Sequence, residues 1–325
     1  MKSRYVAAGL AAAAVAAAII LASSRGDVDR MTYGDGLIYR YVAAHFSQEP
    51  QYISPVVRER GTSLRYGRVG LSALIWVASA GRPSAMPYAQ PVIIILAAAA
   101  AGIASTRLLP RAGPLAPLVP FLAPGFSLAV AGGFAEVVAI AFALWSVVMA
   151  RDERWGIAAS FLAAALLTRE NAGAVLVGLV VWCALRRFLS AIPVLALSVV
   201  PLIIWYGVVA GRYGHIPILD PYLRVTTDTI GPPIVAIGRA LVDSPANSAV
   251  TAAIHLLIAI VAFTYWRRSI VGAIAAASGL QVLAAGRFSF AFEGEAVRQF
   301  ASLQLFMIMA FIWGRWSRDQ ETTTQ

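Results

Sequence analysis

Long apolar runs separated by short basic turns constrain this chain more than any other feature of its sequence. A hydrocarbon core of about 30 Å is crossed by roughly 20 apolar residues in a helix. Hydrophobic residues make up 59% of the 325 residues and charged residues only 13%, whereas soluble domains contain about 25% charged residues. We therefore expect an all-α polytopic membrane helix bundle in a single integral-membrane domain, and neither a soluble enzyme nor a nucleic-acid-binding module. The ten predicted spans are residues 6–22, 69–81, 87–106, 133–150, 155–168, 171–185, 189–210, 247–266, 269–285 and 297–314.

One further apolar stretch, residues 114–131, is predicted to be a broken or re-entrant segment and not a span. Its first eleven residues contain four prolines, and each proline removes a backbone donor and kinks a helix. The positive-inside rule supports this interpretation, because every inner turn then carries a basic residue. With a cytoplasmic N-terminus, the inner side receives Lys2, Arg4, Arg82, Arg151, Arg154, Arg186, Arg187, Arg267, Arg268, Arg315 and Arg318.

We therefore expect a multi-pass protein of the cytoplasmic (inner) membrane, with both termini in the cytoplasm and its active face periplasmic or extracellular. The outer face receives three long segments, residues 23–68, 107–132 and 211–246. The first apolar run has a second interpretation, because Lys2, Arg4 and the small residues at 22–24 also resemble a cleavable signal peptide. We favour a retained first span, and the later spans have the same orientation in both cases.

The first outer loop contains an amphipathic segment at residues 34–46. Its apolar residues recur at helical spacing, which predicts an interfacial helix lying on the membrane surface. Asp35 stands at the start of this helix. An Asp at that position can cap the free backbone N–H groups, or it can act as a general base on an acceptor hydroxyl at the boundary between water and lipid. Both interpretations of Asp35 remain open at the level of sequence.

Several short motifs follow Asp35 in an order that is characteristic of one enzyme superfamily. Tyr39 lies four residues after Asp35, and the other motifs are Tyr52 to Pro55, Arg65-Tyr66-Gly67-Arg68, Gly81-Arg82-Pro83, Leu167-Thr168-Arg169-Glu170-Asn171 and Ala296-Val297-Arg298. This layout, which covers most of the chain, resembles the bacterial members of the GT-C superfamily of integral-membrane glycosyltransferases. These enzymes use polyprenyl-phosphate-linked sugars as donors.

The resemblance implies that a carboxylate in the first outer loop is the catalytic base or positions the acceptor, and Asp35 matches that position. Many family members carry paired acids at this point, whereas Gly36 follows Asp35 here. A second acid must therefore come from elsewhere. Glu59 is the nearest candidate, although its position between Arg58 and Arg60 also fits a solvated charge cluster. The implied partners are a polyprenyl-phosphate-linked sugar, a lipid, glycan or protein acceptor, and membrane lipids.

Other polar residues lie at the outer ends of predicted spans, where ionisable groups are costly unless they face a cavity or a partner. Pairing at helix ends explains them as well as a shared polar cavity does. We expect an arginine to hold the donor phosphate, since its planar fork binds two oxygens at once. Arg298 is preferred over Arg65, Arg68, Arg224, Arg239 and Arg287 because it opens a span. The predicted substrate-binding residues are Tyr39, Arg65, Glu136, Glu170 and Arg298.

The sequence contains no recognisable metal, nucleotide or nucleic-acid motif. No cofactor is predicted, although a divalent cation held between Asp35 and a diphosphate would need no local motif. The single cysteine, Cys183, lies in an apolar run and excludes an internal disulfide. His255 lies in the middle of a predicted span, where a packing residue with a hydrogen bond is more common than a proton relay.

Three functions fit these features. The first is a glycosyltransferase in which an outer arginine holds the donor phosphate and Asp35 activates the acceptor. The second is a transporter or flippase, because discontinuous helices such as 114–131 form binding sites in transporters. The third is a non-catalytic membrane subunit of the same architecture.

Overall fold

The computed structural model describes residues 2–27, 30–32, 35–46, 62–219, 246–284, 297–298 and 300–323. Within these ranges the chain is helical and forms no strand, which confirms the all-α prediction. The fourteen α-helices there are α1 (Lys2–Ser24), α2 (Asp35–Ala44), α4 (Thr62–Gly67), α5 (Val69–Ala78), α6 (Met86–Leu108), α7 (Pro124–Gly132), α8 (Ala135–Arg151), α9 (Trp155–Thr168), α10 (Gly173–Leu185), α11 (Ala191–Ala196), α12 (Val200–Tyr213), α15 (Ala246–Ala262), α16 (Ile270–Ala284) and α19 (Ala301–Thr323). Short 3₁₀ helices join them, of which η4 (Pro110–Leu122) and η5 (Glu170–Ala172) matter here.

Three helical stretches are long and apolar enough to cross a membrane: Ser3–Ser24, Pro83–Leu108 and Ala191–Tyr213. The pair η4 and α7 becomes a fourth if the two helices, which are bent by 66° at Ala123, count as one span. The ten predicted spans are not confirmed. Most of the others are shorter apolar helices, and a helix rises only about 1.5 Å per residue, so ten to seventeen residues cover less than the hydrocarbon thickness.

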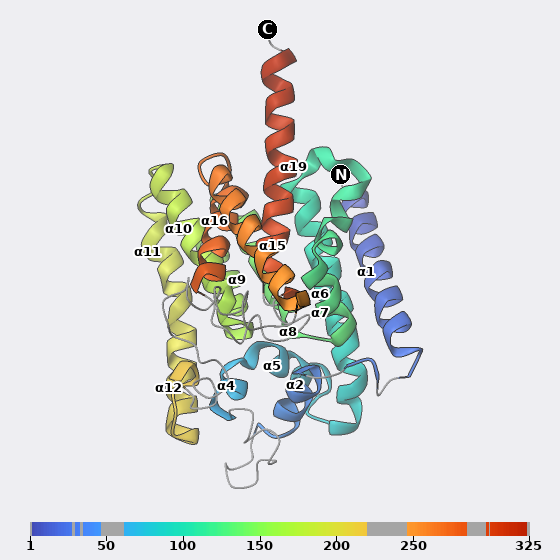
Figure 1. Cartoon of the computed structure of the whole chain (residues 1–325). Coiled ribbons are helices and arrows are strands. Elements are labelled where there is room, and N and C mark those ends of the chain that lie inside the picture. Colours follow the sequence, from blue (N-terminus) through green and yellow to red (C-terminus); the bar gives the residue numbers. More distant parts are fainter. Residues whose placement is uncertain are drawn as a thin grey trace.

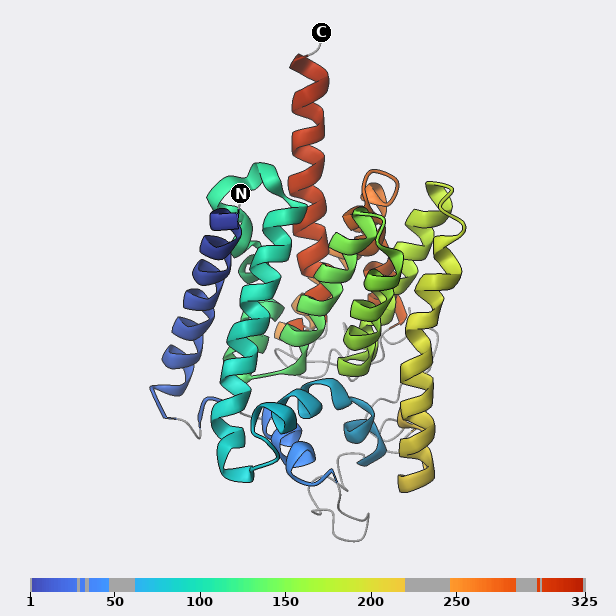
Figure 2. The same cartoon turned by 180° about the vertical axis from the view of Figure 1, so that it is seen from behind.

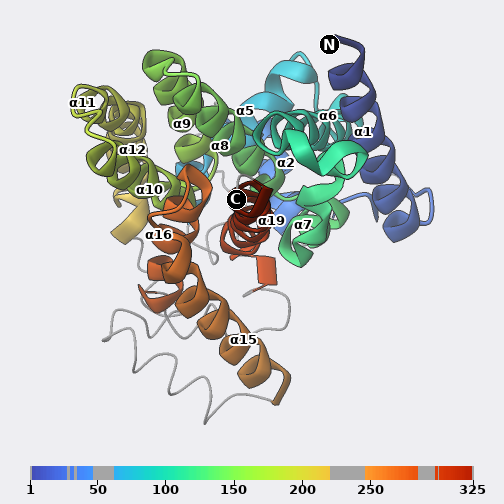
Figure 3. The ribbon, with the colours of Figure 1, turned by 90° about the horizontal axis from the view of Figure 1, so that it is seen from above.

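The helices form a bundle in which the N- and C-termini lie at the same end (Figures 1 and 2). We call this the terminal end; the turns between α8 and α9, α10 and α11, and α15 and α16 also reach it. Helices α2, α4 and α5 lie across the opposite end, which we call the site end (Figure 1). Seen from above, α19 runs near the middle of the bundle (Figure 3).

Two expectations about sidedness are wrong, and they share a cause. Helix α5 has only ten residues and lies across the site end instead of crossing the bundle, so Arg82 stays at that end. Helix α6 then carries the chain to the terminal end, where Arg4 Nη2 donates to the Pro110 carbonyl at 2.7 Å and Arg151 Nη1 donates to the Arg107 carbonyl at 2.7 Å. The start of segment 107–132 therefore lies on the N-terminal side, not opposite it. The two errors cancel, so every later turn keeps its predicted side.

The break predicted from the prolines is present, and η4 and α7 together carry the chain from the terminal end to the site end, where Ser23 Oγ donates to the Ala131 carbonyl at 3.3 Å. After η4, helix α7 runs from Pro124 to Gly132, and Gly133 ends it in the left-handed conformation with φ 67°. Helix α8 begins two residues later and is buried along almost its whole length. Because α8 is covered by protein on all sides, Glu136 in its first turn is enclosed by protein and does not face lipid.

Candidate functional site

Asp35, at the start of α2, forms ion pairs with two arginines from distant parts of the chain. Its Oδ2 lies 3.0 Å from Arg65 Nη1 and accepts a hydrogen bond from Arg298 Nη2 at 3.2 Å. The side chains of Arg65 and Arg298 are 8% and 5% exposed, and that of Asp35 is 17% exposed. The carboxylate therefore links the layer at the site end to the segment that leads into α19.

Glu136 extends this network on the far side of Arg298. Its Oε1 accepts a hydrogen bond from Arg169 Nη2 at 2.7 Å and lies 3.4 Å from Arg298 Nε. The Arg298 guanidinium thus stands between two carboxylates, and it also lies 4.4 Å from the centre of the Phe134 ring, a cation–π contact. We call Asp35, Arg65, Glu136, Arg169 and Arg298 the charged network.

A second pair lies beside the charged network. Arg68 Nε donates to Glu170 Oε2 at 3.0 Å, and Arg68 Nη2 donates to Glu170 Oε1, so the contact is bidentate. Tyr39 lies one helical turn after Asp35 and its side chain is buried. Within the described part of the chain, no group forms a hydrogen bond with the Tyr39 hydroxyl. A buried hydroxyl of this kind is suited to a ligand that supplies the missing partner.

The packing around Gly36 leaves no room for a second acid next to Asp35. A Cβ on Gly36 would lie 2.4 Å from the Gly132 carbonyl oxygen. Gln90 Nε2 fixes this close approach by donating to the carbonyls of Gly36 at 3.0 Å and Gly133 at 2.8 Å. The junction between α7 and α8 therefore occupies the space of a side chain at position 36. The same contact brings Glu136 close to Asp35, so that Arg298 alone lies between the two carboxylates.

The arginines set the protonation state of Asp35. Burial by itself would raise the pKa of this carboxyl group, but the positive charges of Arg65, Arg298 and Arg68 outweigh that effect and hold the pKa well below its usual range. Asp35 is therefore an anion at neutral pH. It is also a weak base for as long as the arginines remain in contact with it.

The predicted shared cavity is present for only some of the residues. A cavity of about 30 Å³ is lined by Glu136 and Arg298 together with Arg169, Asn171 and Ser302. This space is large enough for one or two water molecules. Asp35 and Glu170 join the network through arginine contacts and do not line this cavity.

Of the predicted site residues, the structure gathers Asp35, Tyr39, Arg65, Glu136, Glu170 and Arg298 at the site end. Glu59 lies outside the described residues, as do Arg224, Arg239 and Arg287. The role of Arg169 in the network was not predicted, although the residue lies in one of the quoted motifs. The roles of two buried glutamines, Gln90 and Gln304, were also missed. The only sequence signal of these glutamines is that each is a polar residue inside an apolar run. Within the ranges that the structure describes, no three His, Cys, Asp or Glu side chains form a group that could hold a metal ion.

Comparison with known proteins does not identify the function of this site. No protein-family model, curated protein or solved structure matches the chain significantly. The likeness to GT-C enzymes therefore rests on the order of short motifs in the sequence, and the functional argument rests on the geometry of the charged network.

Proposed function

We propose that this protein is a membrane glycosyltransferase that moves a sugar from a polyprenyl-phosphate donor to an acceptor at the outer face of the cytoplasmic membrane. One observation carries the proposal: Asp35 in the first loop is shared by Arg65 and Arg298 at one end of a membrane bundle. A carboxylate and an adjacent pair of guanidinium groups are the two elements that this reaction needs, a proton acceptor and an anion site.

In the proposed reaction the donor phosphate competes with Asp35 for the two arginines. Guanidinium groups bind phosphate oxygens as readily as carboxylate oxygens. Once Arg65 and Arg298 contact the phosphate, the Asp35 carboxylate accepts the proton of the acceptor hydroxyl. The acceptor oxygen forms a bond to the anomeric carbon, and the bond from that carbon to the phosphate oxygen breaks. The polyprenyl phosphate leaves as an anion, which the arginines stabilise, so no strong general acid is needed.

The basic turns support the orientation in this proposal. Arg4, Arg107, Arg151, Arg186 and Arg267 lie at or next to the terminal end, three of them stacked on tryptophan rings. By the positive-inside rule the terminal end is cytoplasmic and the site end faces outward. In this orientation η4 and α7 begin on the cytoplasmic side at Pro110 and end at the site end, where Gly132 packs on Gly36, so together they form a broken span.

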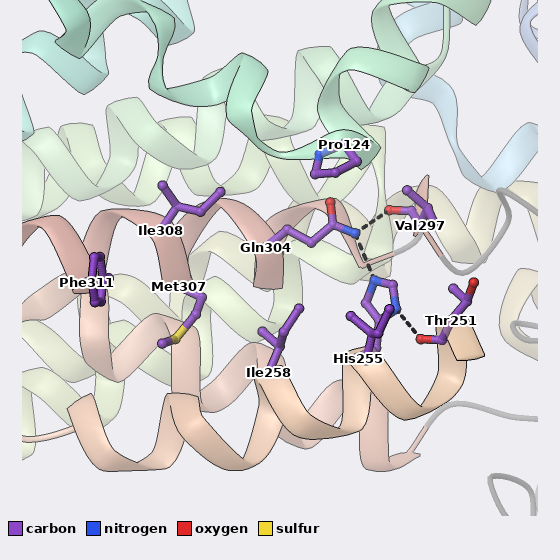
Figure 4. Close-up of a pocket in the computed structure, with 10 residues that line it drawn as sticks. Pro124, Thr251, His255, Ile258, Val297, Gln304, Met307, Ile308 and Phe311 are labelled. Atoms are coloured by element: carbon purple, nitrogen blue, oxygen red, sulfur yellow. Dashed lines mark hydrogen bonds between the residues drawn. The ribbon is translucent and has the colours of Figure 1, made fainter. Parts of the chain in front are cut away.

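An apolar groove next to Arg298 supports a lipid-linked donor. The groove has a volume of about 480 Å³ and lies among α7, α15 and α19, with Val297 in its wall (Figure 4). Val297 directly precedes Arg298, so a hydrocarbon chain in the groove would end beside the charged network. Most of the remaining wall is apolar and consists of Ile254, Ile258, Met307, Ile308 and Phe311.

Replacement of Asp35 tests the proposal. We expect Asp35→Asn and Asp35→Ala to lower sugar transfer from a polyprenyl-phosphate donor in proteoliposomes by about a hundredfold or more, the usual loss when a catalytic base is removed. The matched control is Asp27→Asn, because Asp27 is a half-exposed carboxylate beyond α1 that pairs with Arg30, three residues away in the sequence. Full transfer activity in Asp35→Ala would contradict the assignment of Asp35.

A transporter or flippase is the second candidate, and the 66° bend between η4 and α7 is the observation that favours it. Discontinuous helices form substrate sites in transporters. Movement of a labelled lipid-linked sugar across the proteoliposome membrane, without any glycosylated product, would support this candidate over the transferase.

A further inference from the structure

Gln304 on α19 connects three segments that meet beside the charged network. Its Nε2 donates to the Val297 carbonyl at 3.0 Å and contacts His255 Nε2 at 2.8 Å. Its Oε1 accepts a hydrogen bond from the Gly125 backbone N–H at 2.8 Å. The side chain is 6% exposed. Figure 4 shows it pointing from α19 toward Val297 and the His255 ring of α15.

These contacts allow only one arrangement of the hydrogens. A backbone N–H can only donate, so the Gln304 oxygen must face Gly125 and the amide NH₂ must face the other two partners. His255 Nε2 is then the acceptor, and its Nδ1 carries the proton that is donated to the Thr251 carbonyl at 2.8 Å. His255 is therefore a neutral residue with both ring nitrogens satisfied. This arrangement favours a packing role for His255 over a proton relay.

The Val297 peptide is also held from the side of α7. A Cβ on Gly125 would lie 2.1 Å from the Val297 carbonyl oxygen and 2.8 Å from the Ala301 Cβ. Only glycine allows the first turn of α7 to come this close. The break between η4 and α7 thus supplies a bare backbone N–H and a surface without a side chain, and both contact the segment that carries Arg298.

We infer that Gln304 is a positioning residue for Arg298. By fixing the Val297 peptide, it sets the direction in which the next side chain leaves the backbone, between Asp35 and Glu136. The inference rests on the proposed function, in which Arg298 binds the phosphate of a lipid donor. Gln304 itself contacts neither the phosphate nor the sugar in this arrangement.

The test compares two probes, a long-chain isoprenoid monophosphate and the matching uncharged isoprenol. Gln304→Met loses all three contacts without adding a charge. We expect this variant to bind the monophosphate about tenfold more weakly, the loss that corresponds to roughly one buried hydrogen bond, and to bind the isoprenol unchanged. Ile312→Leu, on the same helix but outside the wall of the groove, is the control that should leave both affinities unchanged. Equal losses for both probes would show a structural role and overturn the inference.

A double-mutant cycle with Arg298 separates this inference from the proposed function. If Gln304 acts through Arg298, then Gln304→Met in the Arg298→Ala protein causes no further loss of monophosphate affinity. Additive losses would overturn the inference while leaving the phosphate role of Arg298 in place. Unchanged monophosphate binding in both Arg298→Ala and Arg298→Lys would overturn the proposed role of Arg298, and with it the inference. Isoprenol binding reports that each variant is folded.

Discussion

The two ends of the bundle use the same ion-pair chemistry in opposite environments. At the terminal end, Asp152 lies between Arg107 and Arg151, with distances of 2.6 and 3.2 Å, and the three side chains are 27–33% exposed. At the site end, Asp35 and Glu136 alternate with three arginines whose side chains are 3–8% exposed. Distances and partners are alike, so exposure is what distinguishes the two clusters.

This difference in exposure determines what each cluster can contribute. Exposed pairs are screened by water and contribute little to stability, so the terminal cluster joins two turns and leaves their basic charge at the surface. Buried pairs have lost their hydration, and apolar residues of similar size would often stabilise the same packing at least as well. A buried network of five charged groups is therefore better explained by a need for fixed charges, as in the proposed phosphate and proton-acceptor site.

Removing the central carboxylate of the buried network should have the largest effect on stability. Glu136→Ala brings the guanidinium groups of Arg169 and Arg298 together without the anion between them, and we expect a loss of about 3–5 kcal/mol in the free energy of unfolding. Denaturant unfolding in detergent measures this change. Glu136→Gln keeps the shape and should lose less. A loss below about 1 kcal/mol in Glu136→Ala would show that the buried ion pairs at the site end contribute no more to stability than the exposed pairs at the terminal end.

The effect of the arginines on Asp35 should appear as a shift in pH dependence. The pKa of Asp35 is lowered in the folded protein, so its ionised form stabilises the fold above the unfolded pKa, and this contribution is lost only as the pH falls through the lower folded value. Between about pH 5 and pH 8, transfer should therefore show no acidic limb from Asp35. Arg65→Gln removes one positive charge and should raise the pKa of Asp35, moving the acidic limb upward. Superimposable pH–rate profiles for the two proteins would contradict this.

The smallest effect is expected at the terminal end. Asp152→Asn removes the shared partner of Arg107 and Arg151, and we expect a loss of about 1 kcal/mol or less, measured by the same unfolding assay. Added salt should reduce the difference further, because exposed charges are screened. A loss as large as that of Glu136→Ala would remove the distinction between the two ends.

Most of the charged network could be predicted because ionisable residues are rare in this chain and expensive at membrane depth. That rule selected Glu136 and Arg298 one at a time from the ends of apolar runs, whereas Asp35 was selected from its position before the amphipathic segment and from the family resemblance. It could not show that Gly36 packs on Gly132, because a glycine next to an acid carries no sign of what it touches. Gln90 and Gln304 were missed for a related reason, since their partners are backbone groups that lie far away in the sequence.

The sidedness of the early segments shows the same limit. Hydropathy detects an apolar run at 69–81 but does not reveal that the helix there has ten residues and lies across the bundle. Arg82 and Arg107 were therefore assigned to the wrong ends. The positive-inside rule did not detect the error, because moving both of them preserves the alternation of the later turns.

The apolar, membrane-like character of this chain, its helical class and the scarcity of its charges can all be predicted from local runs of residues, because each follows from transfer free energies summed along the chain. Which charges meet depends on the tertiary structure. The network joins residues 35, 65, 136, 169 and 298, and such contacts depend on close approaches between helices, as at Gly36 and Gly125. Those approaches arise from the packing of the whole bundle, which no local pattern encodes.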